Sequence, residues 1–141
     1  MADLNSFCKE WNGLTCNFDS DPKYNGQCTQ LVKKWARRNK WAIPNGGGED
    51  AYGYRLFRHG YQWVQNSVFA VPEPGDLVVF KTPPLHWVHG QCLPVGHVAI
   101  ALPSNRFHLN SFDQNWTVKK KCSFVTHRRY KDVVGWLHWV G

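Results

Sequence analysis

The stretch "DSDPKYNGQCTQLVKKW", residues 19–35, leads from a turn-rich segment through a cysteine into a helix. Its first half is rich in Asp, Ser, Pro, Asn and Gly, which favour turns for distinct physical reasons. In its second half apolar side chains recur at i, i+3, i+4 and i+7, the spacing of one helical face. They are Cys28, Leu31, Val32 and Trp35. The sequence therefore predicts a helix that begins at Cys28 and turns that cysteine toward the core.

The rest of the pattern places helices first and strands afterwards. Strands are expected at 76–81, 97–102, 107–118 and 133–140, and further helices within 1–16 and over 51–58. Residues 82–96 read as a long hairpin-like loop, a kind of segment that is often functional. Helices followed by antiparallel strands indicate an α+β fold. The length of 141 residues favours one domain over 1–141.

Composition excludes some classes of protein and leaves others open. Hydrophobic content of 43% and charged content of 19% are typical of a folded globular protein. No apolar run reaches the roughly 20 residues that span a bilayer, and no secretory signal is visible at the N-terminus. We therefore expect synthesis in a cytoplasm and no membrane partner. The net charge of +7 suits nucleic acid, acidic membrane lipid and bacterial wall polymers, and does not choose among them.

Five cysteines are present, an odd number. They are Cys8, Cys16, Cys28, Cys92 and Cys122. None forms a CxxC pair, and their spacing fits no common zinc template. Without a signal peptide, five reduced thiols are favoured over two disulfides and one free thiol.

One of these cysteines stands where a nucleophile is activated. A thiol at a helix N-terminus has a lowered pKa, because unpaired N–H groups point at it. His97 opens an apolar strand, which is an unusual place for a packing residue and a good one for a base. Asp113 and Asn115, two residues apart on the next strand, are both candidates to orient its imidazole. The plain alternative is that Cys28 and His97 are ordinary core residues.

Four short motifs, "YNGQC", "PGDLVVF", "GHVAIAL" and "FDQNW", follow one another in an order that resembles the CHAP domain. This is the cysteine, histidine-dependent amidohydrolase/peptidase family of bacteriophage endolysins and bacterial wall hydrolases. The similarity spans about residues 15–140. It implies a papain-like α+β fold with N-terminal helices packed on an antiparallel sheet. It also implies cleavage of an amide bond in peptidoglycan through an acyl-thioester, either as a crosslink endopeptidase or as an N-acetylmuramoyl-L-alanine amidase.

The resemblance also assigns roles to individual residues. Cys28 matches the nucleophile and His97 the base, with Asp113 and Asn115 as support. The family usually has Glu where this chain has Asp113, so the shorter side chain leaves Asn115 as the alternative orienting residue. Gln27 is expected to help stabilise the oxyanion.

The aspartates upstream of the cysteine resemble the calcium loop of some staphylococcal phage CHAP domains. The ligands implied by position are Asp19, Asp21, the Lys23 carbonyl, Asn25 and Gln30. Gln30 stands where a carboxylate is usual, and Lys23 adds a positive charge, so a weak site is expected. The alternative is an Asx turn with solvated carboxylates.

The leading hypothesis is therefore a monomeric phage lysin that leaves the host cytoplasm without a signal peptide and acts on peptidoglycan. A separate wall-binding domain in a longer parent chain is compatible with it. A bacterial antagonism toxin with the same chemistry and an inactive CHAP-like domain are alternatives. A basic, aromatic-rich nucleic-acid-binding module is a further alternative from another class, although no nucleic-acid motif supports it.

Overall fold

The computed structural model describes residues 1–44, 54, 57–81, 85–88, 91–94 and 96–141. Helices α1 (Leu4–Trp11) and α2 (Cys28–Arg38) come first, separated by the short 3-10 helix η1 (Pro22–Tyr24). The strands that follow are β1 (Tyr61–Gln65), β2 (Leu77–Phe80), β3 (Leu85–Val88), β4 (Gln91–Pro94), β5 (His97–Ala101), β6 (Leu109–Gln114), β7 (Cys122–Arg128) and β8 (Val133–Trp139). A second 3-10 helix, η2 (Tyr130–Asp132), precedes β8.

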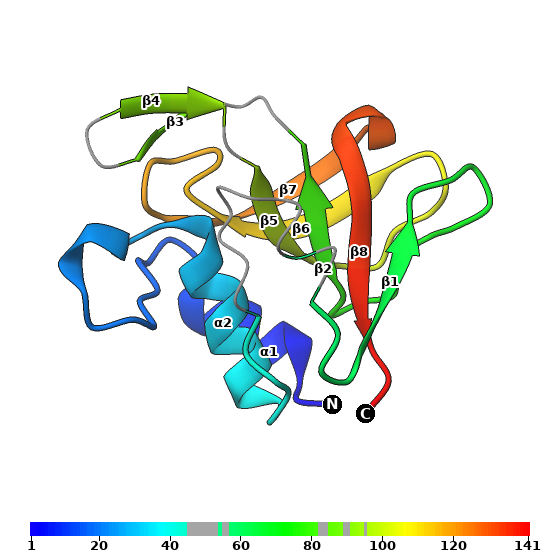
Figure 1. The fold of residues 1–141 in the computed structure, drawn as a ribbon, viewed down its shortest axis with the longest axis horizontal. Helices are drawn as coiled ribbons and strands as arrows, with labels where there is room; N and C mark the ends of the chain where they lie inside the picture. The colour runs from blue at the N-terminus through cyan, green and yellow to red at the C-terminus, as the bar shows by residue number, and fades with distance from the viewer. Residues whose placement is uncertain (45–53, 55–56, 82–84, 89–90, 95) are drawn as a thin grey trace.

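Six of these strands form one antiparallel sheet, which confirms the predicted α+β fold. Their order is β1-β8-β2-β5-β6-β7, and β3 with β4 makes a separate hairpin. Figure 1 shows both helices on one side of the sheet, with the two chain ends close together. The expected strands at 76–81, 97–102 and 133–140 correspond to β2, β5 and β8, and β6 is shorter than expected. In the described part of the chain, no helix is both long and apolar enough to cross a bilayer.

Helix α2 packs against β5 and β6 and sets the position of Cys28. Its apolar face carries Leu31, Val32 and Trp35, which have no exposed surface. Burying each of these side chains contributes about 1.5–3 kcal/mol. The indole Nε1 of Trp35 also donates a 3.1 Å hydrogen bond to the Gly75 carbonyl just before β2. The C-terminal half of α2 is thereby held beside the sheet.

One expected loop contains a hairpin, and one expected helix lies mostly outside the described residues. The hairpin β3–β4 lies within the predicted loop at 82–96. Most of the helix expected over 51–58 lies outside the described residues; within it, Tyr54 is helical and buried. Strands β1 and β7, at the two edges of the sheet, were not expected from the sequence pattern.

Candidate active site

The cysteine that opens α2 is held by a tight turn. Gly26 has a φ of +74°, a left-handed backbone conformation that favours glycine. A Cβ built on Gly26 would lie 2.5 Å from Cβ of Lys120, so a side chain there would also clash. Gln27 then caps the helix in an extended conformation. Cys28 follows as the first residue of α2, 6% exposed.

His97 lies beside this cysteine at the start of β5. Its Nε2 is 2.7 Å from Oδ2 of Asp113, and both side chains are fully buried. The Cys28 side chain also interacts with this ring and raises its pKa. Since Nε2 is taken by Asp113, Nδ1 is the nitrogen left for the sulfur. The structure therefore brings together three of the four residues expected to be catalytic.

The charges of these groups support one another. Burial by itself lowers the pKa of His97, but the negative charge of the Cys28 sulfur and the hydrogen bond that the ring donates to Asp113 raise it to about 9. Burial acts to raise the pKa of Asp113, but its bond with His97 and the charge of Arg128 bring that pKa below 3.8. An imidazolium beside the Asp113 carboxylate and the Cys28 sulfur is the arrangement that results. A thiolate is the reactive form of cysteine, and a neighbouring positive charge favours it.

Arg128, at the end of β7, completes a buried network that the sequence did not suggest. Its Nη1 lies 2.6 Å from Oδ2 of Asp113 and 2.9 Å from Oγ of Ser111. Ser111 in turn donates a 2.6 Å hydrogen bond to Oδ1 of Asp113. Asp113 thus has a partner on each oxygen, which satisfies a carboxylate that has no access to water.

Aromatic rings surround this network. Trp116 packs on the His97 imidazole with ring centroids 4.7 Å apart, and Phe80 packs on it at 5.5 Å. The Arg128 guanidinium lies over both rings, 4.0 Å from Phe80 and 4.4 Å from Trp116. These rings exclude water from the charges, and electrostatic interactions are stronger where water is excluded. Trp116 is 38% exposed and forms an outer wall of the site.

Asn115 is the expected residue that the structure does not bring to His97. Strand β6 ends at Gln114, and Asn115 has a φ of +63°. Its side-chain oxygen accepts a 2.9 Å hydrogen bond from the Lys120 backbone, which closes the turn after the strand. The alternation of side chains along a strand therefore does not extend to this position. Asp113 makes the contact with His97 although its side chain is short.

Gln27 and its neighbour in space, Gln114, hold the backbone before the cysteine. The Gln27 side chain turns back toward the Lys23 carbonyl at 3.4 Å. Its own carbonyl accepts a 2.8 Å hydrogen bond from Nε2 of Gln114. Gln114 also bonds both backbone groups of Cys16, at 2.6 Å to the N–H and 2.8 Å to the carbonyl. Gln114 is fully buried and ties the N-terminal segment to the entry of α2.

The expected calcium ligands are already engaged with one another and with lysines. Oε1 of Gln30 accepts from the backbone N–H groups of Phe18 and Asp19, at 2.9 and 2.7 Å, so its amide nitrogen faces the Asp19 carboxylate at 2.7 Å. Nζ of Lys33 lies 3.0 Å from the same Asp19 oxygen. These contacts, the Gln30 bond first, lower the pKa of Asp19.

The second aspartate of this loop is engaged in the same way. Asp21 accepts from the Lys23 backbone at 3.1 Å and lies 3.4 Å from the Lys23 ammonium. Calcium requires several oxygen ligands around one point. Here an amide nitrogen and an ammonium group both contact Oδ2 of Asp19. The described residues contain no cluster of three acidic, Cys or His side chains arranged for a metal. This donor set does not fit calcium.

The remaining described cysteines differ from Cys28 in their surroundings. Cys8, Cys16 and Cys122 are buried free thiols. Burial raises the pKa to about 12 for Cys8, about 11 for Cys16 and about 12 for Cys122. Cys28, also a free thiol, is the one that contacts His97. The side chain of Cys92 lies outside the described part of the chain.

Comparisons with known proteins agree on the fold. No family model and no curated protein matches the sequence. The crystal structure of wild-type endolysin LysIME-EF1 superposes with a TM-score of 0.71 at 22% identity, over 99% of this chain and 65% of that one. The crystal structure of Ly7917 gives 0.63 at 16% identity, over 98% and 63%. Ly7917 with the hydrolyzing product of MDP gives 0.61 at 16%, over 99% and 64%. The chain therefore spans less than two thirds of these proteins and shares its fold with an endolysin.

Proposed function

We propose that the chain is a cysteine-dependent hydrolase of the CHAP type that cleaves an amide bond in bacterial peptidoglycan. The observation that carries this proposal is the buried contact of Cys28 with His97, whose other nitrogen is 2.7 Å from Asp113. A thiol, an imidazole and an orienting carboxylate in this order are the parts of a nucleophilic acyl-transfer site.

The reaction follows from the protonation states of these groups. The Cys28 thiolate attacks the amide carbonyl, and the backbone N–H groups that open α2 stabilise the oxygen as it becomes negative. The His97 imidazolium gives its proton to the leaving amine, the C–N bond breaks, and an acyl-thioester remains on the sulfur. Neutral His97 then takes a proton from water, whose oxygen attacks the thioester. Release of the carboxylic acid restores the thiolate and the imidazolium.

Asp113 and Arg128 act through His97 in this scheme. Asp113 orients the ring and stabilises its positive charge. Arg128 keeps Asp113 ionised, since its guanidinium nitrogen lies 2.6 Å from the carboxylate oxygen.

The choice of substrate rests on the shared fold and on charge. One structure with this fold is an endolysin, and another was determined with the hydrolyzing product of MDP. A net charge of +7 favours approach to the anionic polymers of a bacterial wall. Action on the wall as a phage lysin fits both observations.

Digestion of purified cell walls tests the proposal. We expect wild-type protein to release fragments and Cys28→Ala to release none, with Cys8→Ala, which removes a buried thiol of α1, as the control. Mass spectrometry of the fragments separates new amino termini in the peptide stem or bridge from free lactyl groups on the glycan. The first result assigns an endopeptidase and the second an amidase. Equal release by wild type and Cys28→Ala contradicts the proposal.

A further inference from the structure

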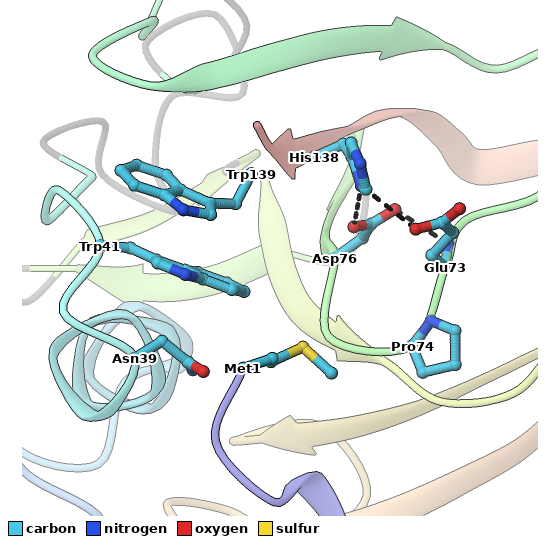
Figure 2. A pocket seen from close by; sticks show the side chains of 8 residues that line it. All are labelled: Met1, Asn39, Trp41, Glu73, Pro74, Asp76, His138 and Trp139. Carbon is cyan, nitrogen blue, oxygen red and sulfur yellow. Dashed lines mark hydrogen bonds and ion pairs between the residues drawn. The ribbon is translucent and has the colours of Figure 1, made fainter. Parts of the chain in front are cut away.

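A cavity of about 740 Å³ lies at the opposite end of α2 from Cys28. One side consists of Trp41 and Trp139, and the other of Glu73, Asp76 and His138 (Figure 2). The 11 residues of α2, at about 1.5 Å per residue, put roughly 16 Å between this cavity and the cysteine. The cavity is therefore separate from the candidate active site.

The aromatic side is made of packed rings, whose two indole N–H groups are donors without a partner among the described residues. Trp41 and Trp139 stack with ring centroids 5.7 Å apart and an interplanar angle of 16°. Tyr61 packs edge-on against Trp139 at 5.0 Å and donates its hydroxyl to the Ala42 carbonyl. Within the described part of the chain, neither indole N–H has a hydrogen-bond partner. These walls offer flat apolar surface together with two N–H donors.

On the polar side of the cavity, Asp76 pairs with His138, and the Glu73 carboxylate remains as an exposed hydrogen-bond acceptor. Oδ1 of Asp76 lies 2.8 Å from Nδ1 of His138, and Oδ2 accepts from the Glu73 backbone at 2.8 Å. The Asp76 carboxylate is thus used to hold the imidazole in place. The Glu73 carboxylate, 73% exposed, approaches His138 at 3.7 Å and otherwise faces solvent. A ligand meets Glu73 as an acceptor and Nε2 of His138 as a further polar contact.

A ligand that fits both sides needs an apolar face, an acceptor for the indoles and a donor for Glu73. An inorganic anion would lie against a carboxylate, and a purely apolar molecule would make no hydrogen bond to Glu73 or to either indole N–H group. A sugar ring carrying an acetamido group meets every requirement. Its C–H face covers indole surface, its carbonyl accepts from an indole, and its N–H and hydroxyls donate to the carboxylate.

We propose that this cavity binds a short saccharide of N-acetylated amino sugars. With the proposed function, on which the choice of source rests, the saccharide is the glycan of the wall whose peptides are cleaved at Cys28. Such a site would place the glycan strand about one helix length away from the scissile amide. It would also raise the time that the enzyme spends on its polymer without any change in the chemical step.

The test uses the full chain carrying Cys28→Ala, so that binding is measured without turnover. Two ligands are titrated: N-acetylglucosamine tetramer, and wall glycan strands freed of peptide. The indole N–H resonances of Trp41 and Trp139, identified with Trp→Phe variants, are expected to shift in a saturable way. Tighter binding of the wall strands assigns the wall as the source. Equal binding of both ligands assigns a general amino-sugar site and still supports the proposal.

Variants distinguish this cavity from other surfaces. Glu73→Gln and Trp139→Phe each remove one hydrogen-bonding group and keep the shape, and each is expected to weaken binding about fivefold. Glu10→Gln is the matched control, since that carboxylate pairs with Arg38 and does not line the cavity. No shift of either indole at millimolar ligand, or equal affinity in all variants, overturns the proposal. Binding with no wall hydrolysis by wild-type protein would instead count against the proposed function alone.

Discussion

The guanidinium of Arg128 and the imidazole of His97 contact the same oxygen atom, Oδ2 of Asp113, at 2.6 and 2.7 Å. With the Cys28 sulfur on the far side of the imidazole, positive and negative groups alternate through the buried site. Each charge has an opposite neighbour, which is what a charge needs where water is excluded. The charge of Arg128 thereby lowers the pKa of Asp113, the carboxylate that holds His97.

Replacing Arg128 tests this control. Arg128→Met leaves Asp113 buried without its cation, and breaking such a pair costs about 3–5 kcal/mol of unfolding free energy. It also removes a charge that lowers the pKa of Asp113, so the acid limb of the pH–activity profile is expected to move to higher pH. Arg128→Lys keeps the charge and is expected to restore the acid limb in part. The profile of kcat/KM against pH measures both.

Arg129→Gln is the matched control, because Arg129 is the exposed neighbour in sequence. Its profile is expected to overlay that of wild type. An unchanged acid limb in a folded Arg128→Met protein would show that Arg128 only supports the fold.

The raised pKa of His97 is expected to set the alkaline limb of the profile of kcat/KM against pH. Hydrolysis needs the imidazolium to protonate the leaving amine, so kcat/KM is expected to fall as pH rises through about 9. Alkylation of Cys28 by iodoacetamide needs only the thiolate and is not expected to fall there. The ion pair also stabilises the fold fully below the ordinary pKa of 6.5, and this contribution is lost as pH rises through about 9. A hydrolytic limb centred near 6.5 would contradict this assignment, and His108→Gln, at an exposed histidine, serves as control.

Much of this arrangement follows from periodicity in the sequence. The stripe beginning at Cys28 predicted α2, and continuous apolar runs predicted β2 and β5, because each of these elements buries a large share of its side chains. Strands β1 and β7 lie at the edges of the sheet and fully bury only their first residues, Tyr61 and Cys122, which gives a weaker pattern. Their absence from the prediction reflects that partial burial.

Only those parts of the candidate site that depend on local sequence pattern could be predicted. Asp113 was expected near His97 since both lie on adjacent strands, and β6 pairs with β5 at Ile100 and Phe112. Asn115 was placed on the same face as Asp113, but the chain turns at that residue. The contact of Arg128 with Asp113 depends on the register between β6 and β7, which no local pattern specifies.

Gln114 offers a test of how the cysteine is held. Gln114→Leu removes the partners of three backbone groups, the N–H and carbonyl of Cys16 and the carbonyl of Gln27. Leaving such buried groups unpaired is expected to cost about 3 kcal/mol of unfolding free energy. Urea denaturation measures this, with Gln62→Leu at an exposed position of β1 as control. Equal stability of the two variants would show that Gln114 does not tie these segments.

The loop before the cysteine is expected to work without calcium. The Lys33 ammonium lies 3.0 Å from the Asp19 carboxylate and neutralises it. The side-chain amide of Gln30 donates a hydrogen bond to the same oxygen. Neither EGTA nor added calcium is expected to change Tm or wall hydrolysis by wild-type protein. A fall in Tm on adding EGTA would contradict the fit described for this loop.

A double variant tests whether this loop can be converted into a calcium site. Gln30→Glu combined with Lys33→Met places two carboxylates side by side with no lysine between them. We expect this protein to be less stable than wild type and to regain Tm when calcium is added. Lys34→Met is the control, a neighbouring lysine that makes no contact with Asp19. A Tm that does not respond to calcium would show that the loop cannot be converted.

The most direct measurement of the central claim is the rate at which each thiol reacts with iodoacetamide near pH 6. Peptide mass spectrometry follows the modification of each cysteine, and wall hydrolysis is assayed in the same samples. The thiolate–imidazolium pair predicts that Cys28 reacts first and that hydrolysis is lost at the same rate. Cys8, Cys16 and Cys122, whose pKa values are raised by burial, are expected to stay unmodified. Hydrolysis that survives complete modification of Cys28 would contradict its role as the nucleophile.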